Sequence, residues 1–199
     1  MNYLKKINRG LLLTAVILLG IAIYLVVQSA WQNTEKTKIE SVCRQYIDTA
    51  VKYGQLPEMY RKDKPDMPQK ELEDYISNMT AEFGTFYQKG DLNLKSVINR
   101  SKASLEDQAA GKGVIFSLKK DILEFSDFIF EGKTVVAGIK SNTVLDGPSA
   151  SVPGTPRAST SAQTSDTITL RKTDGEWKIV YADLQLPVNN NMVPGTAAY

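Results

Sequence analysis

The sequence predicts an α+β protein, in which a long apolar N-terminal helix leads into one domain of helices followed by an antiparallel sheet. Three patterns predict this class. Residues 10–34 carry no charge and are mostly apolar, apolar residues then recur at helical spacing up to about residue 110, and from residue 114 the spacing becomes that of β-strands. The chain has 199 residues, so the part after residue 34 has the length of one ordinary domain.

The apolar segment, residues 10–34, is long enough to cross a bilayer. A hydrocarbon core of about 30 Å requires roughly 20 apolar helical residues, and no Asp, Glu, Lys or Arg falls within this segment. Two interpretations are open, a retained anchor and a cleaved signal peptide. Because residues 11–27 are longer than the apolar core of a signal peptide, about 7–15 residues, we favour an anchor. We therefore expect a transmembrane helix at 10–34.

The residues that flank the apolar segment indicate its orientation. Three basic residues at positions 5, 6 and 9 precede it without an acidic neighbour, whereas Glu35 accompanies the basic residues that follow. Trp31 suits the far membrane interface. We expect residues 1–9 to lie in the cytoplasm and the domain to lie outside the cytoplasmic membrane, as a single-pass protein.

Composition excludes several classes of function. Three of the 24 basic residues precede Glu35, so the domain has 21 basic and 22 acidic residues, without the basic excess of a nucleic-acid binder. The absence of histidine removes the commonest general base and metal ligand, and we expect no metal and no cofactor. The single cysteine, Cys43, excludes an internal disulfide. It is either a buried apolar residue or a thiol that pairs between chains.

Three amphipathic helices are predicted after the apolar segment. The first covers about 35–55, where apolar residues recur at helical spacing from Ile39 to Val51. The second begins with Asp66 as its cap and ends near Gly90, and the third covers 91–110. The first helix follows the apolar segment without a helix-breaking residue, so both can form one continuous helix.

Four antiparallel strands are predicted after the helices, in residues 114–130, 134–145, 167–172 and 176–185. The dipeptide Asp174-Gly175 between the last two is a strong signal for a tight hairpin turn. Residues 147–164 consist almost entirely of Gly, Pro, Ser, Thr and Ala, which predicts a flexible loop. This loop is either a tether for a partner or a tolerated insertion. We expect the domain to span 35–187 and residues 188–199 to be a disordered tail.

Residues 173–180 read Thr-Asp-Gly-Glu-Trp-Lys-Ile-Val and resemble the terminal hairpin of nuclear transport factor 2-like domains. The resemblance implies a cone, with helices packed on the concave face of a curved sheet, often around a pocket. Single-pass members occur among bacterial assembly proteins, including the inner-membrane scaffold of type IV secretion systems and accessory proteins of lipid import. The fold hosts enzymes, binders and scaffolds, so it does not imply one function.

Aromatic residues of the helices and the last strand are the candidates for lining such a pocket. They are Tyr46, Tyr53, Tyr75, Phe83, Tyr87, Trp177 and Tyr181. The helical tyrosines have a second interpretation, as core residues whose hydroxyls reach the rim. The strand carboxylates Asp121, Glu124, Asp127 and Asp183 form no arrangement of base and nucleophile in the sequence, so no catalytic residue is named.

The sequence therefore favours a non-enzymatic, membrane-tethered interaction or scaffold module of a bacterial envelope complex, such as a secretion, conjugation or transport assembly. Its expected partners are the membrane and other proteins of the complex, including further copies of itself. The alternative is an extracytoplasmic domain that binds a small molecule or a lipid in the cone. An enzyme is the least favoured hypothesis.

Overall fold

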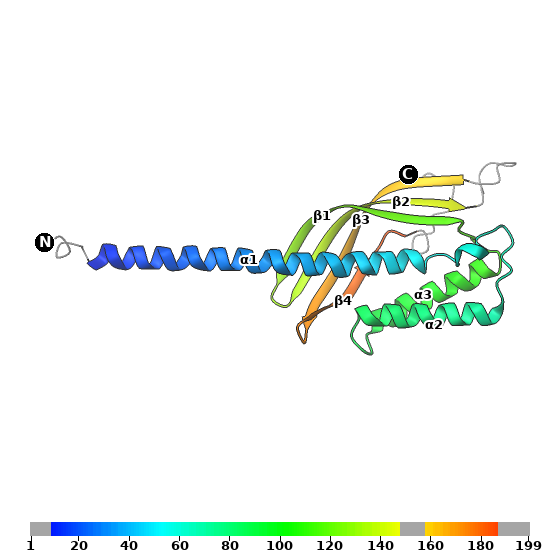
Figure 1. Ribbon diagram of the computed structural model, residues 1–199, viewed down its shortest axis with the longest axis horizontal. Coiled ribbons are helices and arrows are strands. Elements are labelled where there is room, and N and C mark those ends of the chain that lie inside the picture. The colour runs from blue at the N-terminus through cyan, green and yellow to red at the C-terminus, as the bar shows by residue number, and fades with distance from the viewer. Residues whose placement is uncertain (1–8, 148–157, 187–199) are drawn as a thin grey trace. The chain divides into compact units, whose positions relative to one another are not determined.

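The computed structural model describes residues 9–147 and 158–186, and the chain divides into two units, Met1–Lys38 and Ile39–Tyr199. Within the described ranges the elements follow one another as α1 (Arg9–Lys52), the short 3-10 helix η2 (Glu58–Tyr60), α2 (Gln69–Phe86), α3 (Leu92–Ala109), β1 (Ser117–Glu131), β2 (Thr134–Gly147), β3 (Ala158–Thr173) and β4 (Glu176–Asp183) (Figure 1). The predicted α+β class, with helices before an antiparallel sheet, is confirmed.

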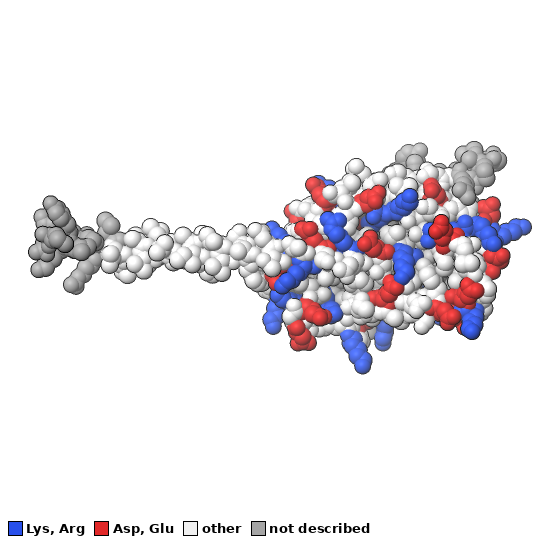
Figure 2. Space-filling model, viewed as in Figure 1, with Lys and Arg blue, Asp and Glu red and all other residues white. Residues whose placement is uncertain are grey.

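The first unit contains the apolar part of α1. Its large apolar side chains from Leu12 to Val27 are exposed, and no charged residue interrupts this part of the helix (Figure 2). Among the described residues, α1 is the helix that is long and apolar enough to cross a membrane. A membrane anchor and a signal sequence both have these properties. Residues 1–8, which the sequence places in the cytoplasm, lie outside the described residues.

The helices of the second unit agree with the predicted periodicity, with one difference at a helix start. Asp91 caps α3, accepting a hydrogen bond from the backbone N–H of Asn93 at 2.7 Å. Helix α2 begins after Pro68 rather than after Asp66. The carboxylate of Asp66 pairs instead with Lys62 at 2.6 Å, so the expected cap at Asp66 is wrong. Pro68 has extended backbone angles, and the helix starts only at the following residue.

The sheet has the predicted meander topology. Its strand order is β1-β2-β3-β4 and every neighbouring pair is antiparallel. The turn between β3 and β4 has positive φ at both Asp174 (52°) and Gly175 (86°), as the Asp-Gly sequence requires.

Strand β1 has two register shifts against β2, between Ile122 and Glu124 and between Phe125 and Asp127. Such bulges bend a strand and protect an edge from further pairing.

Strand β3 is longer than the sequence predicts. It begins at Ala158 and pairs with β2 from Ala158 opposite Gly147 to Arg171 opposite Thr134. Residues 158–164, expected in a flexible loop, are therefore part of the sheet. Small and hydroxylated residues conceal the alternation that identifies a strand, and β2 supplies the pairing partner. Residues 148–157 of the expected loop, and the expected tail 188–199, lie outside the described residues.

One face of the sheet packs against the helices of the second unit (Figure 1). Alternate residues of β2 from Val135 to Leu145 are buried on this inner face. The side-chain amide of Gln55 joins the end of α1 to the sheet, because it accepts from the backbone N–H of Leu118 at 2.8 Å and donates to its carbonyl at 3.1 Å. Tyr87 at the end of α2 forms a backbone bridge with Ile179 of β4. The core fills the space between the two layers; its largest enclosed side chains include Ile39, Ile47, Tyr53, Leu56, Met79, Phe83, Leu105, Ile139, Ile168, Leu170 and Ile179.

Candidate functional site

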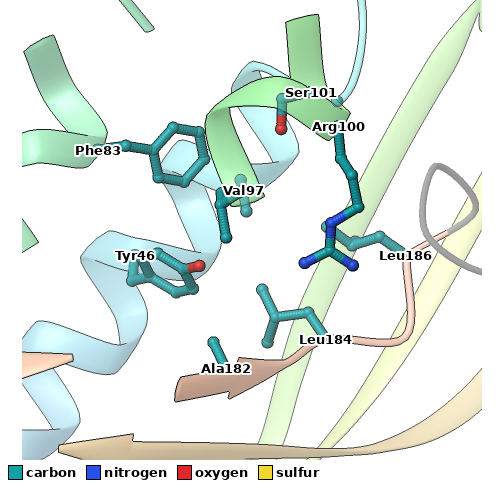
Figure 3. A pocket seen from close by; sticks show the side chains of 10 residues that line it. Tyr46, Phe83, Val97, Arg100, Ser101, Ala182, Leu184 and Leu186 are labelled. Carbon is teal, nitrogen blue, oxygen red and sulfur yellow. The ribbon is translucent and has the colours of Figure 1, made fainter. Parts of the chain in front are cut away.

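A small cavity lies between the helices and the end of the sheet in the second unit (Figure 3). Its volume is about 30 Å³, which holds two or three water molecules at about 10–15 Å³ each. The lining residues come from α1 and the turn after it, from α2 and α3, and from the end of β4 and the segment that follows. They are Tyr46, Ala50, Gly54, Phe83, Val97, Arg100, Ser101, Ala182, Leu184 and Leu186.

The polar side chains of the cavity wall, Tyr46, Arg100 and Ser101, can all donate hydrogen bonds. The hydroxyl of Tyr46 lies 2.8 Å from the hydroxyl of Tyr87, and burial raises the pKa of both phenols. Arg100 and Ser101 extend from α3 toward the same space, and the guanidinium of Arg100 is directed at the gap between Tyr46 and Leu186 (Figure 3). At neutral pH both phenols are therefore protonated, and the positive charge of Arg100 is the charge nearest to them in the cavity wall.

Two of the seven aromatic residues that the sequence proposes for a pocket, Tyr46 and Phe83, line the cavity. Tyr87 lies behind Tyr46, to which it is hydrogen-bonded. Tyr75 donates its hydroxyl proton to the carbonyls at the end of α1, those of Lys52 at 2.8 Å and Gln55 at 3.2 Å.

The other three candidates do not line the cavity. Tyr53 and Trp177 are buried in the core, whereas Tyr181 is 52% exposed on β4. The polar residues of the lining were not among the sequence candidates. Arg100 and Ser101 lie on α3, and in the sequence they resemble polar residues of a solvent-exposed helix face.

A buried ion pair occupies the inner face of the sheet next to the cavity. Lys120 of β1 and Asp166 of β3 reach across β2, with Nζ and Oδ2 2.9 Å apart, and both side chains have no exposed surface. Lys120 also donates to the hydroxyls of Thr143 at 3.0 Å and Thr164 at 2.9 Å. Ser141 donates to the carboxylate of Asp166. Burial lowers the pKa of Lys120, against the opposing effect of Asp166.

The ion pair holds the chain segment that forms one wall of the cavity. The backbone N–H of Gln185 donates to Asp166 Oδ1 at 2.8 Å, and Lys120 donates to the carbonyl of Gln185 at 3.3 Å. The neighbouring residues Leu184 and Leu186 are buried and line the cavity. The network therefore fixes the apolar wall in place, and the polar atoms of the pair have their hydrogen-bonding capacity filled.

The strand carboxylates considered for catalysis do not meet in a site. Asp121, Glu124, Asp127 and Asp183 are all exposed, and Glu124 pairs with Lys140 on the outer face. In the part of the chain that the structure describes, no three His, Cys, Asp or Glu side chains are grouped as a metal site would require. Cys43 is buried, and burial raises the pKa of its thiol to about 12. The described residues thus present donors in a small cavity and no paired base and nucleophile.

Comparison with family models found no match, and comparison with curated proteins found none. Among solved structures, the chain is similar to a protein of Xanthomonas campestris assigned as a calcium/calmodulin dependent protein kinase II association domain, with 14% identity and a TM-score of 0.31, over 61% of this chain and 92% of that one. It is also similar to the intermembrane space region of the chloroplast protein ARC6, with 12% identity and a TM-score of 0.32, over 60% of this chain and 97% of that one. Similarity at this level assigns no function, which is therefore argued from the residues.

Proposed function

We propose that this chain is a non-enzymatic interaction module, with a nuclear transport factor 2-like domain held at a bacterial cytoplasmic membrane by its N-terminal helix. The observation that carries the proposal is the uncharged apolar segment of α1, whose side chains are exposed over the whole of residues 12–27. At roughly 25 cal/mol per Å² of apolar surface removed from water, such a helix is far more stable in a bilayer than in solution.

The charge distribution of the domain supports a protein partner rather than a nucleic acid. Basic and acidic side chains are interspersed on the face shown in Figure 2, without a continuous basic stripe. Exposed apolar side chains on the strands, Leu123, Ile129 and Tyr181, provide contact surface of the kind that protein interfaces use. We place the domain outside the membrane, in a secretion, conjugation or transport assembly.

Photo-crosslinking in intact cells tests this proposal. A photoreactive residue replaces Ile129, which is 57% exposed on β1, and a control replaces exposed Lys112 in the turn after α3. We expect a crosslinked species of defined mass from position 129 and a much weaker one from position 112, and a complex larger than the monomer after gentle detergent extraction. A strictly monomeric particle without crosslinks at either position contradicts the proposal.

The cavity supports a second candidate function, the binding of a small ligand. A lipid acyl chain does not fit a volume of about 30 Å³ unless the walls move, because pockets for drug-sized ligands measure about 300–1,000 Å³. The core between the helices and the sheet is filled by side chains. Only a ligand of a few heavy atoms is compatible with this cavity, and the donors of its wall restrict the chemistry of that ligand.

A further inference from the structure

Three polar groups that can donate hydrogen bonds lie at the cavity, with Arg100 exposed at its rim, Ser101 half-buried and Tyr46 buried. Tyr46 and Tyr87 share one hydrogen bond, and because each hydroxyl has one proton, the pair retains one O–H without a partner. The exposed guanidinium of Arg100 acts electrostatically on Tyr46 but forms no ion pair or hydrogen bond with a described residue, and the half-buried hydroxyl of Ser101 forms no hydrogen bond with one. Tyr46, Arg100 and Ser101 line the cavity, and Tyr87 reaches it through its hydrogen bond with Tyr46.

The cavity wall contains no acidic side chain that would satisfy these donors. Its remaining residues are Ala50, Gly54, Phe83, Val97, Ala182, Leu184 and Leu186. Asp91, which acts electrostatically on Tyr87, is the cap of α3 and accepts hydrogen bonds from the backbone N–H groups of Asn93 and Leu94. A cation above an apolar cavity with two hydroxyl donors is complementary to an anion that carries an apolar substituent.

We propose that this cavity binds the carboxylate of a short aliphatic acid, with Arg100, Ser101 and the Tyr46–Tyr87 pair as the donors. This inference rests on the second candidate function above and not on the anchor or on protein partners. The planar guanidinium of Arg100 matches the two carboxylate oxygens. Leu184 and Leu186 contact the substituent. A volume of about 30 Å³ accepts only the apolar substituent, with one or two carbon atoms, and the carboxylate then lies at the cavity rim beside the exposed Arg100.

Propionate is the probe that tests the site, with the full chain in detergent micelles and binding observed by ligand-detected NMR. Few heavy atoms limit the affinity, so we expect a Kd in the millimolar range. Propanol and propylammonium have a similar apolar part without the carboxylate, and neither should bind. Inorganic phosphate, a tetrahedral anion without an apolar part, should not displace propionate at equal concentration.

Two single substitutions on α3 separate this site from general electrostatic attraction. Arg100→Gln removes the charge in the cavity wall, and Lys95→Gln removes an exposed charge of the same helix that does not line the cavity. We expect Arg100→Gln to weaken propionate binding about tenfold, because the variant loses the charged hydrogen bonds to the carboxylate. Lys95→Gln should leave the Kd unchanged. Both residues are exposed, and circular dichroism verifies that each variant is folded.

Three results overturn the inference. The first is the absence of propionate binding at about 50 mM, a concentration far above the expected millimolar Kd. The second is an equal loss of affinity in Arg100→Gln and Lys95→Gln. The third is that propanol or phosphate displaces propionate as effectively as another carboxylate does. None of these results bears on the crosslinks from position 129, so failure of this site and failure of the interaction module are separate outcomes.

Discussion

Removal of Lys120 leaves the carboxylate of Asp166 enclosed and without its counter-charge. For Lys120→Met we expect a loss of about 3–5 kcal/mol in the free energy of unfolding, as is usual when one member of a buried pair is removed. Addition of Asp166→Asn should recover part of this loss, because no unpaired charge then remains. Urea unfolding followed by circular dichroism measures both variants.

The matched control for this substitution is Lys140→Gln. Lys140 pairs with Glu124 on the outer face, where the two side chains are 57% and 56% exposed. Exposed ion pairs contribute little to stability, so Lys140→Gln should change the unfolding midpoint little. Equal effects of the two lysine substitutions would show that the buried network does not hold the domain together.

The buried thiol of Cys43 makes stability fall as the pH rises above 9. Its pKa is raised from 9.0 to about 12 in the folded domain, so between these values the unfolded chain loses the proton and the folded chain keeps it. The stabilisation is thus complete below pH 9 and is lost toward pH 12. At pH 10 the wild type should have lost roughly 1 kcal/mol relative to Cys43→Ala.

Urea midpoints at pH 8 and pH 10 for both proteins measure this difference. The buried tyrosines act in the same direction above pH 10, since the pKa of Tyr75 is raised to about 12. The lowered pKa of Lys120 acts in the opposite direction. Both contributions are common to wild type and Cys43→Ala and cancel in the comparison. If the difference in urea midpoint between wild type and Cys43→Ala is the same at pH 8 and pH 10, the assignment of a protonated, enclosed thiol is wrong.

Residue-scale features were predictable where they depend on local sequence and were missed where they depend on pairing across the sheet. The interior position of Cys43 follows from its place on the apolar stripe of a helix. Lys120 and Asp166 lie on strands that are not neighbours, and in the sequence each resembles an exposed strand residue. Their contact requires the register of both strands with β2, which no local pattern contains.

Replacement by alanine should change the free energy of unfolding in opposite directions at two glycines, Gly175 and Gly84. Gly175 has a φ of +86° in the hairpin between β3 and β4, where a Cβ is strained, and Gly175→Ala should cost roughly 1 kcal/mol. Gly84 lies within α2, and a Cβ added there meets nothing within 4 Å. Gly84→Ala should stabilise the domain by about 0.5–1 kcal/mol.

Thermal unfolding of the two alanine variants shows whether the turn geometry at Gly175 requires glycine or whether the domain tolerates alanine at both positions. The midpoint should fall for Gly175→Ala and rise for Gly84→Ala. A rise in both would mean that the hairpin does not require positive φ at Gly175, and a fall in both would mean that α2 is not a regular helix at Gly84.

Element boundaries show where periodicity is informative. The helices and the Asp174-Gly175 hairpin follow from spacing and turn chemistry, which are local. The first half of β3 does not, because residues 158–164 contain no large apolar residue and obtain their strand conformation from β2. The register shifts of β1 likewise have no distinct signal, since inserted residues on an edge strand have the same composition as their neighbours.

For the whole molecule, an insertion between the proposed anchor and the domain tests whether the interaction function requires the domain at a fixed position. Helix α1 continues without a break through residues 34–39, and we predict that a short Gly/Ser insertion there reduces crosslinking from position 129 several-fold. A scaffold requires a fixed position, whereas a freely tethered binding domain tolerates the insertion. The amount of membrane-bound chain serves as the control. Unchanged crosslinking would favour the small-ligand function over the interaction module.

We propose that the uninterrupted apolar segment of α1 retains the domain outside the cytoplasmic membrane, and protease treatment of spheroplasts tests this placement. After alkaline extraction of membranes, the chain should remain in the pellet at its full mass of 22.0 kDa. Protease added to intact spheroplasts should degrade the domain, while a cytoplasmic marker survives. A shortened chain in the soluble fraction, or a domain that is protected until the spheroplasts are lysed, would contradict the account.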